Sequence, residues 1–162
     1  MAQPPAPSTT LLLGADRPAR CRWLVAAAVA EAAAGLPVLY VCRRARFEAH
    51  FAETLEAAAA DRRDADLARI SVKYVSSCDE LRWLMSEVQL LAPRAVFVED
   101  VDDDGLFDVL DDVVPFLALA ADAAAMLPAR VVVSSRVGPL DIARRHDIKR
   151  FATVVECDGP RR

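Results

Sequence analysis

Two kinds of segment alternate along the chain. Short continuous apolar runs suit the strands of a parallel sheet covered on both faces, and alanine-rich stretches with apolar residues at helical spacing indicate helices. The predicted strands are 9–13, 37–42, 69–75, 94–100, 128–135 and 151–157. The predicted helices are 19–34, 47–60, the segment from Ser77 to Pro93, 106–126 and 139–147. This order predicts an α/β fold with a doubly wound, mainly parallel sheet.

Local signals set the ends of some of these elements. Gly35 is a natural stop for the first helix. Ser77, followed three residues later by Glu80, is a capping box. Apolar residues recur at helical spacing after this box: Leu81, Leu84, Met85, Val88 and Leu91. Trp23 and Trp83 fall inside predicted helices, so we expect both side chains to pack in the core.

The length of 162 residues fits one domain. We expect a flexible segment over 1–8, the domain over 9–158 and a short tail over 159–162. No apolar run reaches the roughly 18 residues of a membrane span, and the N-terminal residues carry no basic region typical of a signal peptide. These features predict an intracellular protein without a membrane segment.

Charge and cysteine spacing narrow the function classes. The net charge of −4 does not indicate nucleic-acid binding by the whole surface. The four cysteines form no C-x-x-C pair, so no zinc site is expected, and Cys42 and Cys157 lie in apolar runs typical of the core. His50 and His146 each stand alone, which favours no catalytic or metal-binding role.

The turn after the first strand has the frame of a phosphate-binding loop, G-x-x-x-x-G-K-[ST]. Gly14 begins it, but Ala19, Arg20 and Cys21 stand at the second glycine, the lysine and the hydroxyl residue. Alanine resists a positive φ, Pro18 lacks an amide donor, and a thiol is a poor ligand for Mg²⁺. The segment is therefore either a degenerate nucleotide site or a plain strand–turn–helix corner.

A second motif lies about eighty residues later. The strand RAVFVED ends in Glu99 and Asp100, as a Walker B strand ends in an acid. Both acids are expected beside the loop at the carboxyl edge of the sheet, where α/β proteins bind ligands. The acids that follow them also suit the N-terminus of the next helix. Ser134 and Ser135 end another strand at this edge, where plain strand-end serines are favoured over a phosphate sensor.

Basic residues form two clusters that could contact DNA phosphates or an acidic partner. The first comprises Arg43, Arg44 and Arg46, and the second comprises Arg144, Arg145, Lys149 and Arg150. Together they could form a basic stripe, or they could be solvated loop residues. Few aromatic residues are available as stacking platforms, so we expect any DNA contact to be modest and salt-sensitive. Helix 106–126 is apolar on most faces, which indicates either a partner or the monomer core.

Several segments resemble one family. LLLG at 11–14, LPVLYVCRR at 36–44, ARISVKYVSSCDELRWLM at 68–85, AVFVEDVDD at 95–103 and VVVSS at 131–135 are similar to the SWIM-associated protein of the metazoan Shu complex, a small recombinase paralogue with a RecA-like core. The resemblance implies homologous-recombination DNA repair in the nucleus. It also implies a heterodimer with a SWIM-domain zinc protein that promotes recombinase filaments on single-stranded DNA.

The chain departs from this family at the site that would hold ATP and Mg²⁺. Ala19, Arg20 and Cys21 replace the usual residues, and Arg43 and Arg44 lie where full recombinases carry a catalytic glutamate. We therefore expect weak or absent catalysis, with ATP binding at most weak. Two alternatives stay open: an active P-loop ATPase in which Arg20 replaces lysine, and a structural RecA-like scaffold subunit of a complex such as Elongator. A self-polymerisation motif of the Phe-x-x-Ala type is not found near the N-terminus.

Overall fold

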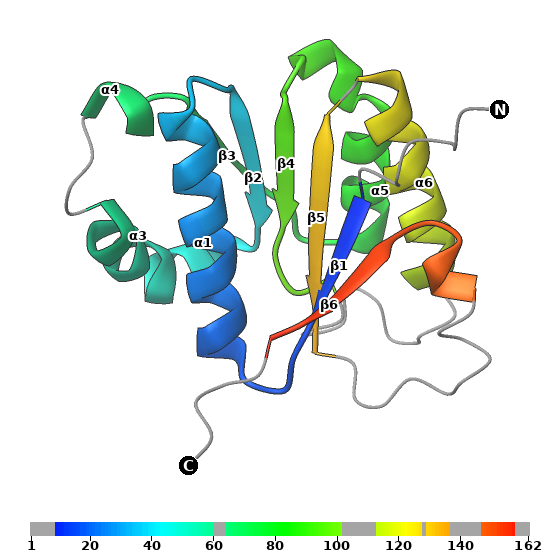
Figure 1. Ribbon diagram of the computed structural model, residues 1–162, viewed down its shortest axis with the longest axis horizontal. Coiled ribbons are helices and arrows are strands. Elements are labelled where there is room, and N and C mark those ends of the chain that lie inside the picture. Colours follow the sequence, from blue (N-terminus) through cyan, green and yellow to red (C-terminus); the bar gives the residue numbers. More distant parts are fainter. Residues whose placement is uncertain (1–8, 60–63, 102–112, 128, 137–146, 158–162) are drawn as a thin grey trace, which may run out of the picture.

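Six parallel strands form one sheet in the computed structural model, which describes residues 9–59, 64–101, 113–127, 129–136 and 147–157 (Figure 1). The strands are β1 (Thr9–Leu13), β2 (Val38–Cys42), β3 (Ile70–Tyr74), β4 (Ala95–Val98), β5 (Arg130–Ser135) and β6 (Thr153–Glu156). Their order across the sheet is β3-β2-β4-β5-β1-β6, and every pairing is parallel. The predicted α/β fold with a parallel sheet is confirmed.

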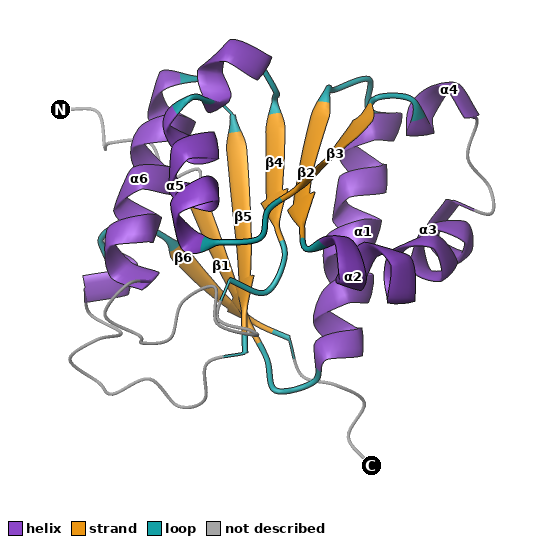
Figure 2. Ribbon diagram, turned by 180° about the vertical axis from the view of Figure 1, so that it is seen from behind, coloured by secondary structure: helices purple, strands orange, loops and turns teal. Residues whose placement is uncertain are grey.

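Helices cover both faces of this sheet. They are α1 (Arg17–Ala33), α2 (Arg44–Arg46), α3 (Ala52–Ala59), α4 (Asp64–Leu67), α5 (Cys78–Ser86) and α6 (Val113–Met126). A π-helical turn, η1 (Phe47–Phe51), joins α2 to α3, and a 3₁₀ turn, η2 (Val88–Leu91), follows α5. Helices α1, α3 and α4 lie on one face, and α5 and α6 lie on the other (Figures 1 and 2).

The core has two layers because the sheet is buried on both sides. β2 and β4 are buried at every position, as their continuous apolar sequences require. One cluster joins Leu12, Tyr40 and Phe97 to α1, and the other joins Leu39, Val98 and Val133 to α5 and α6. Alternate residues of each strand therefore contribute to opposite layers.

Capping residues define the helix that follows β1. Asp16 is the N-cap of α1, and Pro18 occupies the first turn, where a missing amide donor is tolerated. Gly35 adopts a φ of 88° just beyond the C-terminal end, so the predicted glycine stop is confirmed. At α5, the Ser77 side chain accepts a hydrogen bond from the Glu80 amide at 3.2 Å, as the predicted capping box requires. The carboxylate of Glu80 accepts hydrogen bonds from the amide and the hydroxyl of Ser76 at 2.7 and 2.8 Å, and the backbone of Ser77 also contributes.

Some sequence-based expectations were wrong. The predicted helix over 47–60 is interrupted at its start by η1 and preceded by α2. Trp83 was expected in the core, but α5 turns it outward and 67% of its surface is exposed. Leu91 is also exposed, because α5 ends at Ser86 and the tighter turn of η2 shifts the helical phase. The N-terminal part of predicted helix 106–126 and most of helix 139–147 lie outside the described residues.

Candidate functional site

The two predicted motifs meet at the carboxyl edge of three neighbouring strands. Gly14 follows β1, Glu99 and Asp100 follow β4, and Ser134 and Ser135 end β5, which lies between β1 and β4. The chain leaves β1 toward β2 and leaves β5 toward β6, in opposite directions across the sheet. Such a switch point is where open α/β sheets form ligand crevices.

Asp100 is held rigidly at this edge. Its amide donates to Ser134 Oγ at 2.8 Å, and Ser134 Oγ donates to Asp100 Oδ1 at 3.0 Å. The residue has a positive φ of 44°, a conformation that aspartate tolerates better than most residues. Only 4% of its surface is exposed. The strand-end Ser134 is thus an anchor for the acid, a role that its sequence position did not reveal.

Arg20 is fully buried, with 0% of its surface exposed, in the corner formed by Gly14 after β1, the start of α1 and Asp100 after β4. We call this site the Arg20 corner. Its Nε donates to Asp100 Oδ1 at 2.9 Å, and its Nη1 donates to the Gly14 carbonyl oxygen. Arg17 Nε lies 3.5 Å from the other Asp100 oxygen. The residue in the position of the phosphate-binding lysine therefore binds the loop itself and the Walker B-like acid.

The N-terminus of α1 is also occupied by the chain's own groups. The Asp16 carboxylate accepts from the Ala19 amide at 3.5 Å, and the Asp16 carbonyl accepts from the Arg20 amide at 3.1 Å. Pro18 has no amide hydrogen to offer. Because Asp16 already places a negative charge at the positive end of the helix dipole, a triphosphate would meet repulsion there and would find the Ala19 and Arg20 amides already bonded. These residues do not fit ATP with Mg²⁺.

Gly14 has a different reason to be glycine than the one the motif indicates. It does not adopt a positive φ, unlike Gly35. A Cβ placed on Gly14 would lie 2.5 Å from the carbonyl oxygen of Cys157, which follows β6. The Cys157 amide in turn donates to the Leu13 carbonyl at 2.6 Å. Gly14 therefore allows the chain after β6 to approach the loop.

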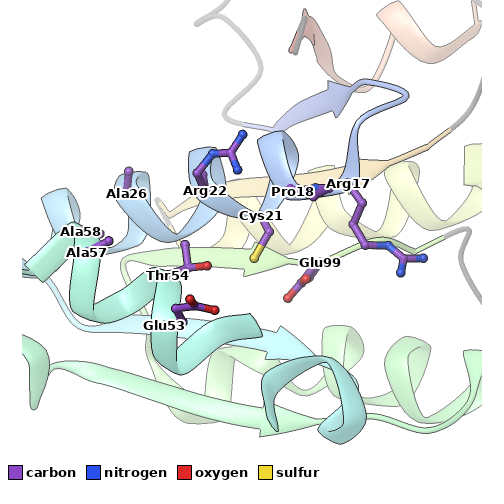
Figure 3. Close-up of a pocket in the computed structure, with 10 residues that line it drawn as sticks. All are labelled: Arg17, Pro18, Cys21, Arg22, Ala26, Glu53, Thr54, Ala57, Ala58 and Glu99. Atoms are coloured by element: carbon purple, nitrogen blue, oxygen red, sulfur yellow. The ribbon is translucent and has the colours of Figure 1, made fainter. Parts of the chain in front are cut away.

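Cys21 and Glu99 point away from the Arg20 corner into a second space. Figure 3 shows both side chains facing a cavity of about 540 Å³ between α1 and α3, which Thr54 also lines. Burial, followed by the charge of Glu99, raises the pKa of the Cys21 thiol to about 12. A neutral thiol is neither a ligand for Mg²⁺ nor an active nucleophile.

Glu99 is a buried acid that bonds to Tyr40 and Cys21. Tyr40 donates its hydroxyl hydrogen to Glu99 Oε2 at 3.1 Å. Burial raises the pKa of Glu99, and the neighbouring charge of Asp100 raises it further. The hydrogen bond from Tyr40 opposes this shift. The environment therefore favours the protonated carboxyl more strongly than water does.

We expect Glu99→Gln to stabilise the protein increasingly as pH rises. The folded-state pKa of Glu99 lies above 4.5, so the folded chain holds this proton at pH values where the unfolded chain has released it. Stability is consequently lost as pH rises from about 4.5 through the raised pKa. Glutamine carries no charge and avoids this loss. Urea unfolding between about pH 4 and pH 8 measures the difference, which should be smallest at the acidic end.

The exposed Glu56 provides the matched control for this titration. Glu56→Gln makes the same chemical change at an exposed position, where a surface substitution usually changes stability by less than about 0.5 kcal/mol. A stability difference between wild type and Glu99→Gln that does not vary with pH would contradict the account of Glu99.

The first basic cluster lies at the carboxyl end of β2, but its members face different neighbours. Arg43 Nη2 donates to the Ser76 carbonyl at 3.4 Å. The Arg44 guanidinium lies over the Tyr74 ring, 5.2 Å from its centroid. Arg46 lies close enough to Glu99 for its charge to lower that group's pKa. Each arginine is thus partly engaged within the protein.

The second basic cluster is placed elsewhere. Lys149 and Arg150 are exposed and precede β6, at the opposite edge of the sheet from β3 and at the amino end of the strands. Arg144 and Arg145 lie outside the described residues. The described members of the two clusters therefore lie apart and do not form the basic stripe that was considered from the sequence.

Other sequence-based expectations have plain outcomes. Cys42 is buried in the core as predicted, and burial raises the pKa of its thiol to about 12. Cys157 is half-buried and packs against the α1 side of the core. The side chain of His50 and the whole of His146 lie outside the described residues. Within the described ranges, no group of three or more histidine, cysteine or acidic residues could hold a metal ion.

Comparisons with known proteins do not assign this chain to a family. Neither the models of known protein families nor the curated protein sequences match this chain. No helix in the described part of the chain combines the length and apolar character needed to cross a membrane.

Proposed function

We propose that this chain is a non-catalytic RecA-like subunit that acts by binding other proteins. In this proposal it is a recombinase paralogue in homologous-recombination DNA repair, the partner of a SWIM-domain zinc protein in a mediator heterodimer. The heterodimer promotes or stabilises recombinase filaments on single-stranded DNA in the nucleus. The sequence resemblance supports the mediator role, and the geometry of the Arg20 corner supports the absence of catalysis.

One observation carries the non-catalytic part of the proposal. The guanidinium of Arg20 is fully buried and bonds to Asp100 and to the Gly14 carbonyl. In a working phosphate loop the equivalent cation reaches the β- and γ-phosphates. Here the same position satisfies the chain's own carboxylate, so an ATP molecule would have to break a buried ion pair before binding.

The strand arrangement supports the RecA-like part. The loop-bearing strand β1 and the acid-bearing strand β4 are separated by the single strand β5, and both motifs open on the same edge. Arg43 and Arg44 lie directly after β2, where full recombinases carry a catalytic glutamate, and neither can act as a general base for water. The active-ATPase alternative is therefore not favoured by any described contact.

Nucleotide binding provides the first test. We expect purified protein to show no saturable binding of labelled ATP with Mg²⁺ up to about 1 mM, a limit that corresponds to about −4 kcal/mol. We also expect no steady phosphate release. Micromolar binding together with turnover would contradict the proposal and favour an active P-loop ATPase.

A matched variant shows whether the loop residues are responsible. The triple variant Ala19→Gly, Arg20→Lys and Cys21→Ser restores the glycine, lysine and hydroxyl of the motif. We expect it to bind ATP more tightly than the wild type, because lysine no longer spans from Asp100 to the loop carbonyl, while Asp16 at the N-cap of α1 keeps the binding weak. The same assay is applied to the wild type and the variant. ATP binding by the variant alone shows that the loop residues block the site, and no binding by either shows that the rest of the fold does not form one.

The partner provides the second test. Affinity purification of the chain from its native cells should recover a SWIM-domain zinc protein in stoichiometric amounts. Recovery of a tRNA-modifying assembly would instead support the scaffold alternative. This result is independent of ATP binding, so the two halves of the proposal can fail separately.

A further inference from the structure

The exposed large apolar side chains of the described residues are not scattered. Five are more than 40% exposed, and three of them lie together on α5 and η2 beside the end of β3: Trp83 (67%), Leu90 (75%) and Leu91 (48%). Tyr74 (41%), at the end of β3, contacts Phe47 and Arg44 instead. The fifth, Met126, ends α6. A gathered apolar surface on a small domain marks an interaction site more often than chance exposure.

These side chains border a groove that follows the edge strand β3. Two hollows of about 430 and 440 Å³ lie along the strand and are adjacent, because Lys73 and Leu91 line both. The floor is formed by Ser71 and Lys73, and the wall by residues of α5 and η2. We call this feature the β3 groove.

Among the described residues, no helix covers one face of β3. A parallel sheet normally has helices over both faces. The α1-side residues of β3, Ile70 and Val72, are half-buried against the core, whereas Ser71 and Lys73 on the other face are exposed. Helix α5 lines the groove together with the end of β3, but it lies beside α6 and does not extend over the strand (Figure 2).

Charged groups at the groove are arranged for a complementary partner. Lys73 lies on the floor, and Glu87 lies on the α5 wall. Neither forms an ion pair with another described residue, and Glu80 at the far end is already bonded to Ser76. A partner with a carboxylate toward the floor and a cation toward α5 would pair both charges.

We infer that the β3 groove docks an amphipathic helix of a partner protein, which completes the helical layer over β3. Five residues of strand span roughly 16 Å, a length that about three helical turns match. The helix would place apolar residues at i, i+3, i+4 and i+7 against Trp83, Leu90 and Leu91. A helix fits better than an added strand, because the groove opens on the face of the sheet and not along its hydrogen-bonding edge.

The energetic centre of this surface is Trp83. Tryptophan is enriched among residues that dominate interface energies, and truncating such a residue commonly weakens binding by more than tenfold. Because Trp83 is exposed in the free chain, its replacement should not disturb folding. The inference goes beyond the proposed function. Three strands separate β3, at one edge of the sheet, from β1. The β3 groove shares no residue with the site formed by Arg20, Asp100 and Gly14.

Site-specific crosslinking in the native cells tests the inference. A photoreactive p-benzoylphenylalanine replaces Trp83, and the same residue replaces Met126 in a control chain. We expect the Trp83 position to crosslink one protein at a segment with apolar residues at i, i+3, i+4 and i+7, and the Met126 position not to do so. No crosslink, a crosslink to a second copy of this chain, or a crosslink to a segment with strand-like alternation would overturn it.

Binding measured with a synthetic peptide of the captured segment completes the test. Against the full chain, Trp83→Ala and Leu90→Ser should each weaken the peptide's affinity by roughly tenfold or more. Met126→Ser should leave it within about twofold, and circular dichroism should show that all three variants are folded. Equal effects of the three substitutions would overturn the inference. Because no nucleotide or DNA is present, failure here is distinct from failure of the mediator proposal.

Discussion

Arg20→Ala is expected to lower the free energy of unfolding by about 3–5 kcal/mol, the usual effect of removing one partner of a buried ion pair. The substitution leaves the Asp100 carboxylate buried with Ser134 and without the guanidinium 2.9 Å away. It also leaves the Gly14 carbonyl without its donor. For a chain of this size the melting temperature should fall by roughly 10 °C, which urea unfolding and calorimetry can both measure.

A surface arginine provides the matched control. Arg130 pairs with Glu31 at 3.0 Å but is 45% exposed, so Arg130→Ala should cost at most about 1 kcal/mol. The double variant Arg20→Met with Asp100→Asn should lose less than the sum of the single variants, because no buried charge stays unpaired. If Arg20→Ala were no more damaging than Arg130→Ala, the guanidinium would not be bound inside the corner.

Gly14→Ala is expected to destabilise the protein by about 1–3 kcal/mol, the range for overpacking a filled site. The new Cβ would meet the Cys157 carbonyl oxygen at 2.5 Å, and backbone cannot move aside as a flexible side chain can. The strain should fall on the pairing of β1 with β6. Amide hydrogen exchange at Val154 and Val155 should therefore accelerate more than exchange in β2.

Gly35 separates this clash from the general effect of losing a glycine. It has a positive φ of 88° but open space around the position of a Cβ, so Gly35→Ala adds only backbone strain of about 1 kcal/mol. Gly35→Ala should leave exchange in β6 unchanged. Equal exchange rates in β6 for the two variants would contradict the close approach at Gly14.

The fold could be predicted from local patterns, because each strand and helix carries its own signal. The continuous apolar sequence of β2 predicts burial on both faces, and Ser77 predicts the start of α5. Each of these signals lies within a few consecutive residues, so it can be detected without knowing which segments pack together in the folded protein. The strand bounds agree with the prediction to within two residues at either end.

The chemistry of the corner could not be predicted in the same way. The direction of the Arg20 side chain depends on Asp100, which lies eighty residues away and is itself fixed by Ser134. The motifs place all three residues at one edge of the sheet, but they do not predict that Arg20 and Ser134 bond to Asp100. One missed signal was local: Asp16 two residues before Pro18 is a pattern typical of a helix N-cap, and it already indicates a blocked anion site.

The exposure of Trp83 is a second instance of this limit. Helical spacing places Leu81, Leu84 and Met85 on one face of α5, and all three are buried as expected. Trp83 lies between them in sequence but on the other face, so spacing alone already assigned it away from the core face. The expectation of burial came from the position of Trp83 inside a helix, without regard to the face of that helix, and it failed because Trp83 lies on the exposed face.

A crystal structure grown with ATP and Mg²⁺ at millimolar concentration tests the central claim most directly. The account predicts that the Arg20 guanidinium keeps its bonds to Asp100 and the Gly14 carbonyl, with no triphosphate at the N-terminus of α1. An ordered triphosphate with a metal ion beside Cys21, and Arg20 displaced from Asp100, would contradict it.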